Sequence, residues 1–232
     1  MNNPLKLFSN GLLLVMVILR SDAQFSSTTT QHDTRVNIER HAYFDATSKW
    51  DKPNIFVCWE NPSDQFTREM LLVQTAVQQS WEAVSAVRFT GWQKCATANA
   101  GIHIAILDSS GPLTQTLGRH LDGIPNGMIL DFTFESWNPM NPNCKLAREF
   151  CIRAIAVHEF GHGLGFAHEQ NRPDTPGECA QLKSGPDGTQ LLTPYDPESV
   201  MNYCNPTYNN GGKLSATDAE AVKNIYGEKP AS

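Results

Sequence analysis

Several features that would place this sequence in common protein classes are absent. None of its apolar runs approaches the length of about 20 residues with which a helix crosses a bilayer. Acidic residues outnumber basic ones by 24 to 18, and the formal net charge of −6 lacks the positive balance that nucleic-acid binding requires. The sequence also contains no Gly-x-Ser-x-Gly motif and no phosphate-binding glycine loop. We therefore expect no nucleic-acid partner and no membrane span.

The amino terminus has the pattern of a secretory signal. Lys6 precedes the short apolar stretch Leu12 to Leu19, and Ser21-Asp22-Ala23 provides small residues at a cleavage position. The apolar stretch is too short for a membrane anchor. We expect residues 1–23 to be a signal peptide, 24–49 a flexible spacer or short pro-segment, and the mature protein to be secreted, to the extracellular space or the periplasm.

The cysteines fit an exported protein better than a zinc-thiolate site, because no two of them are spaced Cys-x-x-Cys. An even set of six in an oxidising compartment predicts disulfides, and six cysteines allow 15 pairings. Proximity along the chain and loop placement favour Cys58–Cys95, Cys144–Cys151 and Cys179–Cys204.

The apolar pattern of the remaining chain predicts one domain over residues 50–232. Apolar residues recur every three or four positions in 66–87, which indicates a long helix. Ser215-x-x-Asp218 is a helix-start pattern, and Gly227 can stop that helix. The full expectation is strands at 55–59, 87–92, 101–107 and 128–134, a loop at 108–127, helices at 66–87, 147–163 and 215–227, and irregular chain at 169–213. His103 alternates with its apolar neighbours, so we expect it to face solvent or the rim of a strand.

The segment from His158 to His168 predicts a zinc site. Residues four apart lie on one face of a helix, so His158 and His162 can direct ring nitrogens at one ion. Gly165 can adopt positive φ, end the helix and return the chain so that His168 becomes the third ligand. Three protein ligands leave a fourth position open, which is typical of a catalytic zinc site rather than a structural one.

Glu159 follows the first histidine and would lie beside that open position. A carboxylate there can take a proton from an attacking water and pass it to a departing amine. The alternatives are chance occurrence of these residues or a metal binder that has no activity. The pattern favours hydrolysis, with one zinc ion, and no pattern in the sequence supports calcium as a second ion.

These motifs resemble the metzincin metallopeptidases. His158-Glu-x-x-His-x-x-Gly-x-x-His168 matches their zinc signature, and Ser199-Val-Met-Asn-Tyr203 matches their methionine turn. Gly165 to Asp174 is most similar to the astacin family, although Thr175-Pro176 and two of the cysteines depart from the usual pattern. The resemblance implies an α+β fold, with a twisted mixed sheet and helices in an upper subdomain (about 50–168). An irregular lower subdomain (about 169–228) would carry the methionine turn and a terminal helix.

The resemblance also implies roles for single residues. Met201 would support the zinc site from below without binding the ion. Tyr203 would be a displaceable extra ligand whose hydroxyl stabilises the oxyanion, and Glu169 would pair with a new, buried amino terminus. We therefore expect a secreted, monomeric zinc endopeptidase acting on proteins or peptides. The alternative from another class is a secreted binding protein or toxin subunit that zinc stabilises and that lacks catalysis.

Overall fold

A mixed sheet of five strands, in the order β3-β2-β4-β6-β5, forms the centre of the computed structural model. β2 (Asn54–Trp59) pairs in parallel with β3 (Arg88–Lys94) and with β4 (Ile102–Ile106). β4 pairs in parallel with β6 (Met128–Leu130), and β5 (Leu113–Thr114) runs antiparallel to β6 at the edge. Every residue of β4 is buried, as expected for a strand with neighbours on both sides and cover on both faces.

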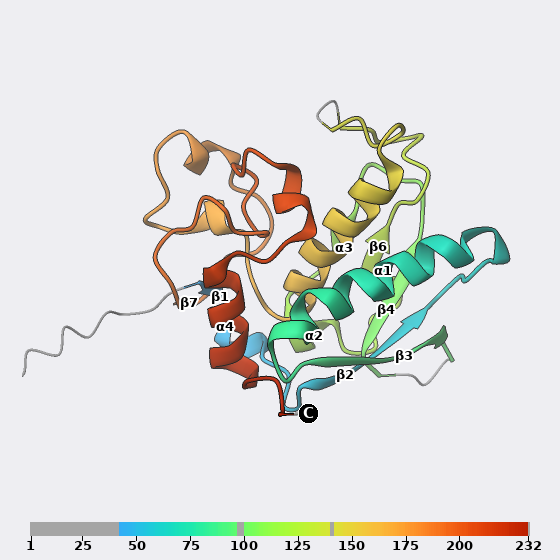
Figure 1. Cartoon of the computed structure of the whole chain (residues 1–232), viewed down its shortest axis with the longest axis horizontal. Coiled ribbons are helices and arrows are strands. Elements are labelled where there is room, and N and C mark those ends of the chain that lie inside the picture. The colour runs from blue at the N-terminus through green and yellow to red at the C-terminus, as the bar shows by residue number, and fades with distance from the viewer. Residues whose placement is uncertain (1–41, 97–99, 140–141, 232) are drawn as a thin grey trace, which may run out of the picture. The chain divides into compact units, whose positions relative to one another are not determined.

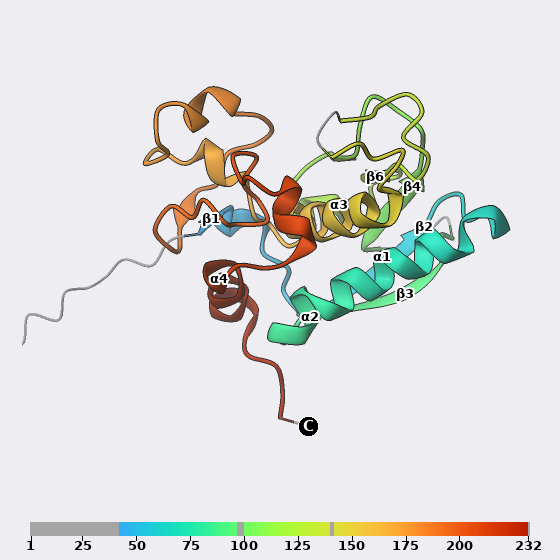
Figure 2. The ribbon, with the colours of Figure 1, turned by 45° about the horizontal axis from the view of Figure 1, so that its top comes forward.

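The long helices lie on one face of this sheet (Figures 1 and 2). α1 (Thr67–Gln79) and α3 (Arg148–Gly163) pack against each other, and the short α2 (Trp81–Val84) follows α1 directly. The structure describes residues 42–96, 100–139 and 142–231, all within one unit of the chain. The core between the sheet and α3 is aromatic, with Phe160 packed edge-on against Phe89 at a centroid distance of 4.7 Å.

The single helix expected at 66–87 is interrupted at Ser80, which divides it into α1 and α2. Ser80 has φ −110° and ψ −93°, outside the helical range. Its hydroxyl donates a hydrogen bond to the carbonyl of Ala76 at 2.8 Å, and such local bonds compete with the helical ladder. The apolar periodicity could not reveal this break, because the buried stripe continues across it.

The strand expected at 128–134 ends earlier, at Leu130. Asp131 Oδ1 accepts hydrogen bonds from the main-chain N–H groups of Thr133 and Phe134, which turns the chain away from the sheet. The expected loop at 108–127 contains the edge strand β5 and a short 3₁₀ turn, η3 (Gly118–Leu121).

The chain after α3 is mostly irregular, as the sequence predicts. Its short elements are η4 (Glu169–Asn171), η5 (Cys179–Leu182), β7 (Gln190–Leu191), η6 (Tyr208–Gly212) and the helix α4 (Ala216–Tyr226). The helix start predicted at Ser215 is confirmed as a capping box: Ser215 and Asp218 each accept the other's main-chain N–H at 3.0 Å.

The folded region begins before the expected boundary at residue 50. β1 (Tyr43–Phe44) pairs antiparallel with β7, and η1 (Ala46–Ser48) follows it. Phe44 is buried and lies 5.6 Å, between ring centroids, from Phe166. Residues 43–48 are therefore part of the folded domain and do not belong to the spacer expected at 24–49.

The signal peptide expected at 1–23 lies outside the described residues. Within the described ranges, no helix is long and apolar enough to cross a membrane.

Candidate metal centre and active site

Helix α3 carries the first half of the site. It is almost entirely buried from Cys151 onward, because α1, η6 and the strands β5 and β6 pack against it. The main-chain carbonyls at its end, which have no partner within the helix, accept hydrogen bonds from distant side chains: Trp50 binds the carbonyl of Gly163 and Tyr226 that of Leu164. The end of the helix is thus fixed in place next to its two histidines.

Gly165 turns the chain back toward the helix with φ +100°, a conformation that favours glycine. A Cβ at this position would lie 2.6 Å from Phe44 Cε2 and 2.6 Å from Ser48 Oγ, so both the backbone conformation and the packing require glycine. Three residues later, His168 lies beside His162, with ring centroids 4.5 Å apart.

The three histidines direct their Nε2 atoms at one point. His168 Nε2 lies 3.2 Å from His158 Nε2 and 3.1 Å from His162 Nε2. Each Nδ1 lies 2.8 Å from a main-chain carbonyl oxygen: that of Val200 for His158, of Phe166 for His162 and of Ser184 for His168. A carbonyl only accepts, so every Nδ1 carries the proton and every Nε2 presents a lone pair.

This donor set fits a zinc ion. Three lone pairs that face one another repel unless a cation lies between them, and a tetrahedral ion with Zn–N bonds of about 2.0–2.1 Å separates its ligand nitrogens by about 3.3 Å. The observed separations of 3.1 and 3.2 Å are close to that value. Carbonyl partners on Nδ1 are the arrangement that commonly orients histidine ligands.

Burial keeps these imidazoles neutral. Desolvation, with a smaller contribution from His168, lowers the pKa of His158 to about 3. The pKa of His162 falls well below its ordinary value for the same reasons, and burial also lowers the pKa of His168. Neutral imidazole is the form that binds metal, so the site is prepared for an ion at neutral pH.

Glu159 lies next to the triad and is buried. Burial raises the pKa of its carboxyl to about 7, while a hydrogen bond from Thr114 acts in the opposite direction. Thr114 Oγ1 donates to Glu159 Oε2 at 2.7 Å from the edge strand β5. A divalent cation in the triad would favour the carboxylate further. Thr114 was not expected from the sequence, because nothing in the local pattern connects β5 to α3.

Met201 packs against α3 at Gly161. It is 2% exposed, and a Cβ at Gly161 would overlap its Sδ atom. The methionine turn is held by Asp218 of α4, which accepts the Ser199 hydroxyl at 2.7 Å and the Val200 N–H at 2.9 Å. Asp218 therefore both caps α4 and positions the turn whose Val200 carbonyl orients His158.

Tyr203 packs against two histidines of the triad and is 46% exposed. Its ring is 4.3 Å from the ring of His168 and stacks at 5.4 Å on that of His158, measured between centroids. Desolvation raises the pKa of its hydroxyl, which stays protonated at neutral pH. Its main-chain N–H donates to Gln170 Oε1 at 3.0 Å.

Glu169 has partners other than the amino terminus that the resemblance implies. Its Oε1 accepts the N–H of Asp196 at 2.9 Å and lies 3.4 Å from Nη1 of the buried Arg172. Burial raises the pKa of the Glu169 carboxyl to about 8, and Arg172 acts to lower it. A new amino terminus would come from the chain ahead of residue 42, outside the described residues.

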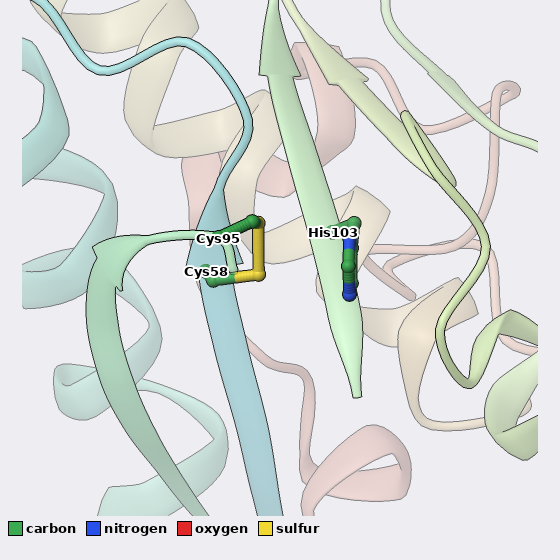
Figure 3. Close-up of side chains that lie close together, drawn as sticks. All are labelled: Cys58, Cys95 and His103. Carbon is green, nitrogen blue, oxygen red and sulfur yellow. A yellow bond between two sulfur atoms is a disulfide. The ribbon is translucent and has the colours of Figure 1, made fainter. Parts of the chain in front are cut away.

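A second group of metal-ligand residue types, Cys58, Cys95 and His103, is not a metal site, because its two sulfurs are joined in a disulfide (Figure 3). His103 is 5% exposed and its Nδ1 lies 2.7 Å from Glu60 Oε1. The expectation that His103 faces solvent was wrong, because β4 is covered on both faces.

The structure contains Cys58–Cys95, Cys144–Cys151 and Cys179–Cys204, the three pairs that chain proximity favours.

Comparisons with known proteins find similarity to zinc metallopeptidases. Residues 141–178 match the model of the astacin peptidase family. Zinc metalloproteinase dpy-31 of Caenorhabditis elegans is 27% identical over 206 residues, covering 82% of this chain and 30% of that protein. Its namesake from Teladorsagia circumcincta is 27% identical over 170 residues, covering 67% of this chain and 24% of that protein. The chain spans less than a third of the length of these curated relatives.

Solved structures support the fold. A structure of myroilysin covers 82% of this chain and 99% of its own, with a TM-score of 0.57 at 20% identity. A crystal structure of myroilysin covers 78% of this chain and 86% of its own, with a TM-score of 0.51 at 21% identity. The expected α+β fold is confirmed by these structures, and the astacin-like character that the motifs indicate is confirmed by the family model and the curated relatives.

Proposed function

We propose that this astacin-like metallopeptidase is a secreted zinc endopeptidase that hydrolyses peptide bonds with Glu159 as general base. One observation carries the proposal: the Nε2 lone pairs of His158, His162 and His168 converge, and a buried carboxylate lies beside them. The same histidines would suit a structural ion, but a structural zinc site has four protein ligands. Within residues 42–96, 100–139 and 142–231, the histidine, cysteine and acidic side chains grouped at this point are three.

Zinc in the triad would supply Lewis-acid polarisation of a peptide carbonyl and of a water molecule. Glu159 takes the proton of the attacking water at its carboxylate. It then delivers this proton to the amine nitrogen as the carbon–nitrogen bond breaks. Thr114 holds Oε2 of this carboxylate at 2.7 Å and thereby limits the rotation of the side chain.

Tyr203 contributes a hydrogen-bond donor. Because its pKa is raised, the hydroxyl is protonated at neutral pH and can donate to the carbonyl oxygen as negative charge develops there. The ring contacts with His158 and His168 keep this donor near the reacting carbonyl. Met201 packs against α3 and fixes the distance between the helix and the methionine turn. It does not contribute a ligand.

Secretion is supported by two independent features. The sequence begins with a signal-peptide pattern, and three disulfides connect parts of the described chain. Disulfides of this number are rare in reducing compartments. The substrates would then be extracellular proteins or peptides.

The experiment compares purified protein, carrying one zinc per chain, with its Glu159→Gln variant on casein or gelatin. We expect cleavage that a zinc chelator abolishes and that added zinc restores. The variant should keep its zinc, measured by atomic emission, and lose turnover by about 10²–10⁴-fold, since it can no longer accept the proton.

The matched control is Glu149→Gln, at the exposed start of the same helix, where Glu149 pairs with the exposed Arg68. This control should cleave as the wild type does. Ordinary activity in Glu159→Gln would contradict the general-base role. Zinc binding without any cleavage by the wild type would support the alternative of a secreted zinc-stabilised binding protein.

A further inference from the structure

Two aspartates follow neighbouring parallel strands of the central sheet. β4 and β6 pair in parallel, and the N–H of Leu107 donates to the carbonyl of Leu130 at 3.0 Å. Asp108 and Asp131 are the next residues along each chain segment, so they lie at the same edge of the sheet, and their carboxyl groups are in hydrogen-bonding contact. Asp131 is 2% exposed, whereas Asp108 is exposed. A solvent-exposed carboxyl group therefore lies against a buried one.

The two oxygens of the Asp131 carboxyl group have unequal partners. Oδ1 accepts the N–H groups of Thr133 at 2.8 Å and of Phe134 at 2.9 Å. Oδ2 is inaccessible to solvent and has no hydrogen-bond donor in the part of the chain that the structure describes. Buried polar atoms are nearly always paired, and neither water nor a ligand can reach this one, so its partner is a group within the fold. The Asp108 carboxyl group is in contact with it and fills that role.

Two carboxyl groups in contact need a proton between them. Carboxylates only accept hydrogen bonds and repel each other, so such a pair holds one proton. A proton on Asp131 Oδ2 makes this atom a donor to the Asp108 carboxylate. Burial raises the pKa of Asp131, and the charge of Asp108 acts in the same direction. The N–H of Ser136 lowers the pKa of Asp108, and so does its contact with Asp131. Asp131 is therefore the member of the pair that holds the proton.

The cations near this edge of the sheet are bound to other groups. Lys145 pairs with Glu135. Arg148 donates to the carbonyl of Phe132 at 2.7 Å and pairs with Glu69. Among the described residues, the groups that shift the pKa values of the two aspartates include no lysine, arginine or histidine. The pair therefore depends on its own proton, and the pH decides whether its hydrogen bond forms.

The segments that follow the two aspartates form one wall of the active-site cavity. This cavity has a volume of 460 Å³, and residues 110–112, Trp137 and Glu159 line it. Residues 110–112 follow Asp108 directly. Asp108 Oδ1 also accepts the N–H of Ser136, the neighbour of Trp137, at 2.8 Å. The aspartate pair therefore joins the two chain segments that form this wall.

We propose that Asp131 and Asp108 share one proton and that their hydrogen bond positions this wall of the cavity, so that peptides bind less tightly once the proton is lost. The statement about peptides rests on the proposed peptidase function. When the pH rises above the raised pKa of Asp131, both carboxyl groups are ionised and repel each other, and they no longer hold the two segments together. Both aspartates are positioning residues, because neither is among the residues that line the cavity.

Asp131→Asn tests the shared proton without any peptide. The amide supplies a donor at every pH and keeps an oxygen acceptor for Thr133 and Phe134. Because the pKa of Asp131 is raised by folding, the folded wild type holds more protons than the unfolded chain, and it loses stability as the pH rises from about 4 to that pKa. In urea denaturation at pH 4–8, the unfolding constant of the wild type should rise relative to that of the variant, by about 10-fold for each pH unit between the two pKa values.

Asp51→Asn is the matched control, since 88% of the Asp51 side chain is exposed. Its unfolding constant should follow that of the wild type within about 2-fold at every pH. A ratio between wild type and Asp131→Asn that is equally independent of pH would overturn the proposal.

Two substitutions of Asp108 distinguish a shared proton from a different role of the carboxyl groups. Asp108→Asn donates to the Asp131 carboxylate from the other side and keeps the acceptor for Ser136, so it should remove the pH dependence as Asp131→Asn does. Asp108→Ala leaves Asp131 without a partner and should raise the unfolding constant at pH 4 by at least about 5-fold. Equal unfolding constants of the two Asp108 variants would contradict a hydrogen bond between the aspartates.

Peptide binding tests the position of the wall. The probe is a fluorescein-labelled casein peptide that the wild type cleaves, and the protein is zinc-loaded Glu159→Gln, in which the general base does not titrate. Its Kd, measured by fluorescence anisotropy with the zinc content checked at each pH, should rise by about 3–10-fold between pH 5 and pH 8. With Asp131→Asn added, Kd should stay constant.

The outcomes separate this proposal from the proposed function. If the wild type cleaves no casein, the peptidase function is refuted, and the urea measurements still decide whether the proton is shared. If the wild type cleaves casein but Kd rises equally with and without Asp131→Asn, the positioning role of the aspartates is refuted and the peptidase function stands.

Discussion

The two halves of the candidate active site are built in different ways. Helix α3 contributes His158, Glu159 and His162 from one buried helix, whose geometry main-chain hydrogen bonds determine. The irregular chain after Gly165 contributes His168 and Tyr203, which contact distant parts of the chain. We refer to these as the helical half and the irregular half.

The irregular half is held by polar contacts between residues far apart in the sequence. The Ser184 carbonyl orients His168, Gln170 binds the Tyr203 N–H, and Asp218 anchors the methionine turn. Each of these contacts can be lost alone, whereas a residue inside a packed helix moves only with its neighbours. We therefore expect substitutions far from the metal to disturb the irregular half more than the helical half.

The largest effect should come from the residue that joins the two halves. Gly165→Ala adds a Cβ 2.6 Å from Phe44 and forces positive φ on alanine, so we expect a loss of about 2–5 kcal/mol in the free energy of unfolding. Zinc affinity should fall by at least about 10-fold, because His168 is displaced. Urea denaturation and zinc titration measure both quantities.

Gly177→Ala is the control for this experiment. Gly177 is exposed, and a Cβ there would meet no atom within 4 Å. The free energy of unfolding should change by less than about 0.5 kcal/mol. If both glycine variants behave alike, the turn at Gly165 is not what connects the halves.

Removing one disulfide at a time allows the stability and zinc affinity of the two halves to be compared. Cys58–Cys95 closes 37 residues of the sheet region and Cys179–Cys204 closes 25 residues of the irregular half. Loop-closure entropy assigns each about 3–4 kcal/mol, so replacing either pair with serine should cost similar stability. Only removal of Cys179–Cys204 should also weaken zinc binding, by about 10-fold or more, because that disulfide lies in the same half as His168. Equal zinc affinities in the two variants would show that the halves do not differ in this respect.

A smaller effect tests the packing between the halves. Gly161→Ala would overlap Met201, so we expect about 1–3 kcal/mol of destabilisation from overpacking. The double variant Gly161→Ala with Met201→Ala should lose less than the sum of the single variants, with a coupling of about 1 kcal/mol. Gly163→Ala is the milder control, because its Cβ would approach only the end of the Ile102 side chain and, at a greater distance, that of Met128. Additive losses would mean that α3 and the methionine turn are not in energetic contact.

The smallest effect concerns the pH dependence of activity. Thr114→Val removes the donor that lowers the pKa of Glu159, so this pKa rises. Because a protonated Glu159 cannot accept the proton of water, activity falls as the pH drops below this pKa. The acid limb of kcat/KM should therefore move to higher pH by about one unit, the equivalent of one hydrogen bond to a charged group. Thr114→Ser keeps the hydrogen-bond donor and should show the wild-type pH profile. If the acid limb of Thr114→Val does not shift, Thr114 does not influence the pKa of Glu159 during catalysis.

Sequence patterns predicted the helical half well. His158, Glu159 and His162 lie within about one turn of a helix, so their relative positions follow from helical geometry. The positive φ of Gly165 was also expected from the sequence, since few other residues adopt this conformation. Neither inference required knowledge of the rest of the chain.

The tertiary structure alone decided which groups surround these residues. Thr114 is 45 residues from Glu159 in the sequence, and Asp218 is 18 residues from Val200, so no local periodicity could pair them. His103 follows the alternation of a half-exposed strand, yet it is buried and its Nδ1 lies 2.7 Å from Glu60 Oε1. Local patterns record the geometry of neighbouring residues, whereas these contacts arise only when distant segments pack together, and that packing depends on the whole chain.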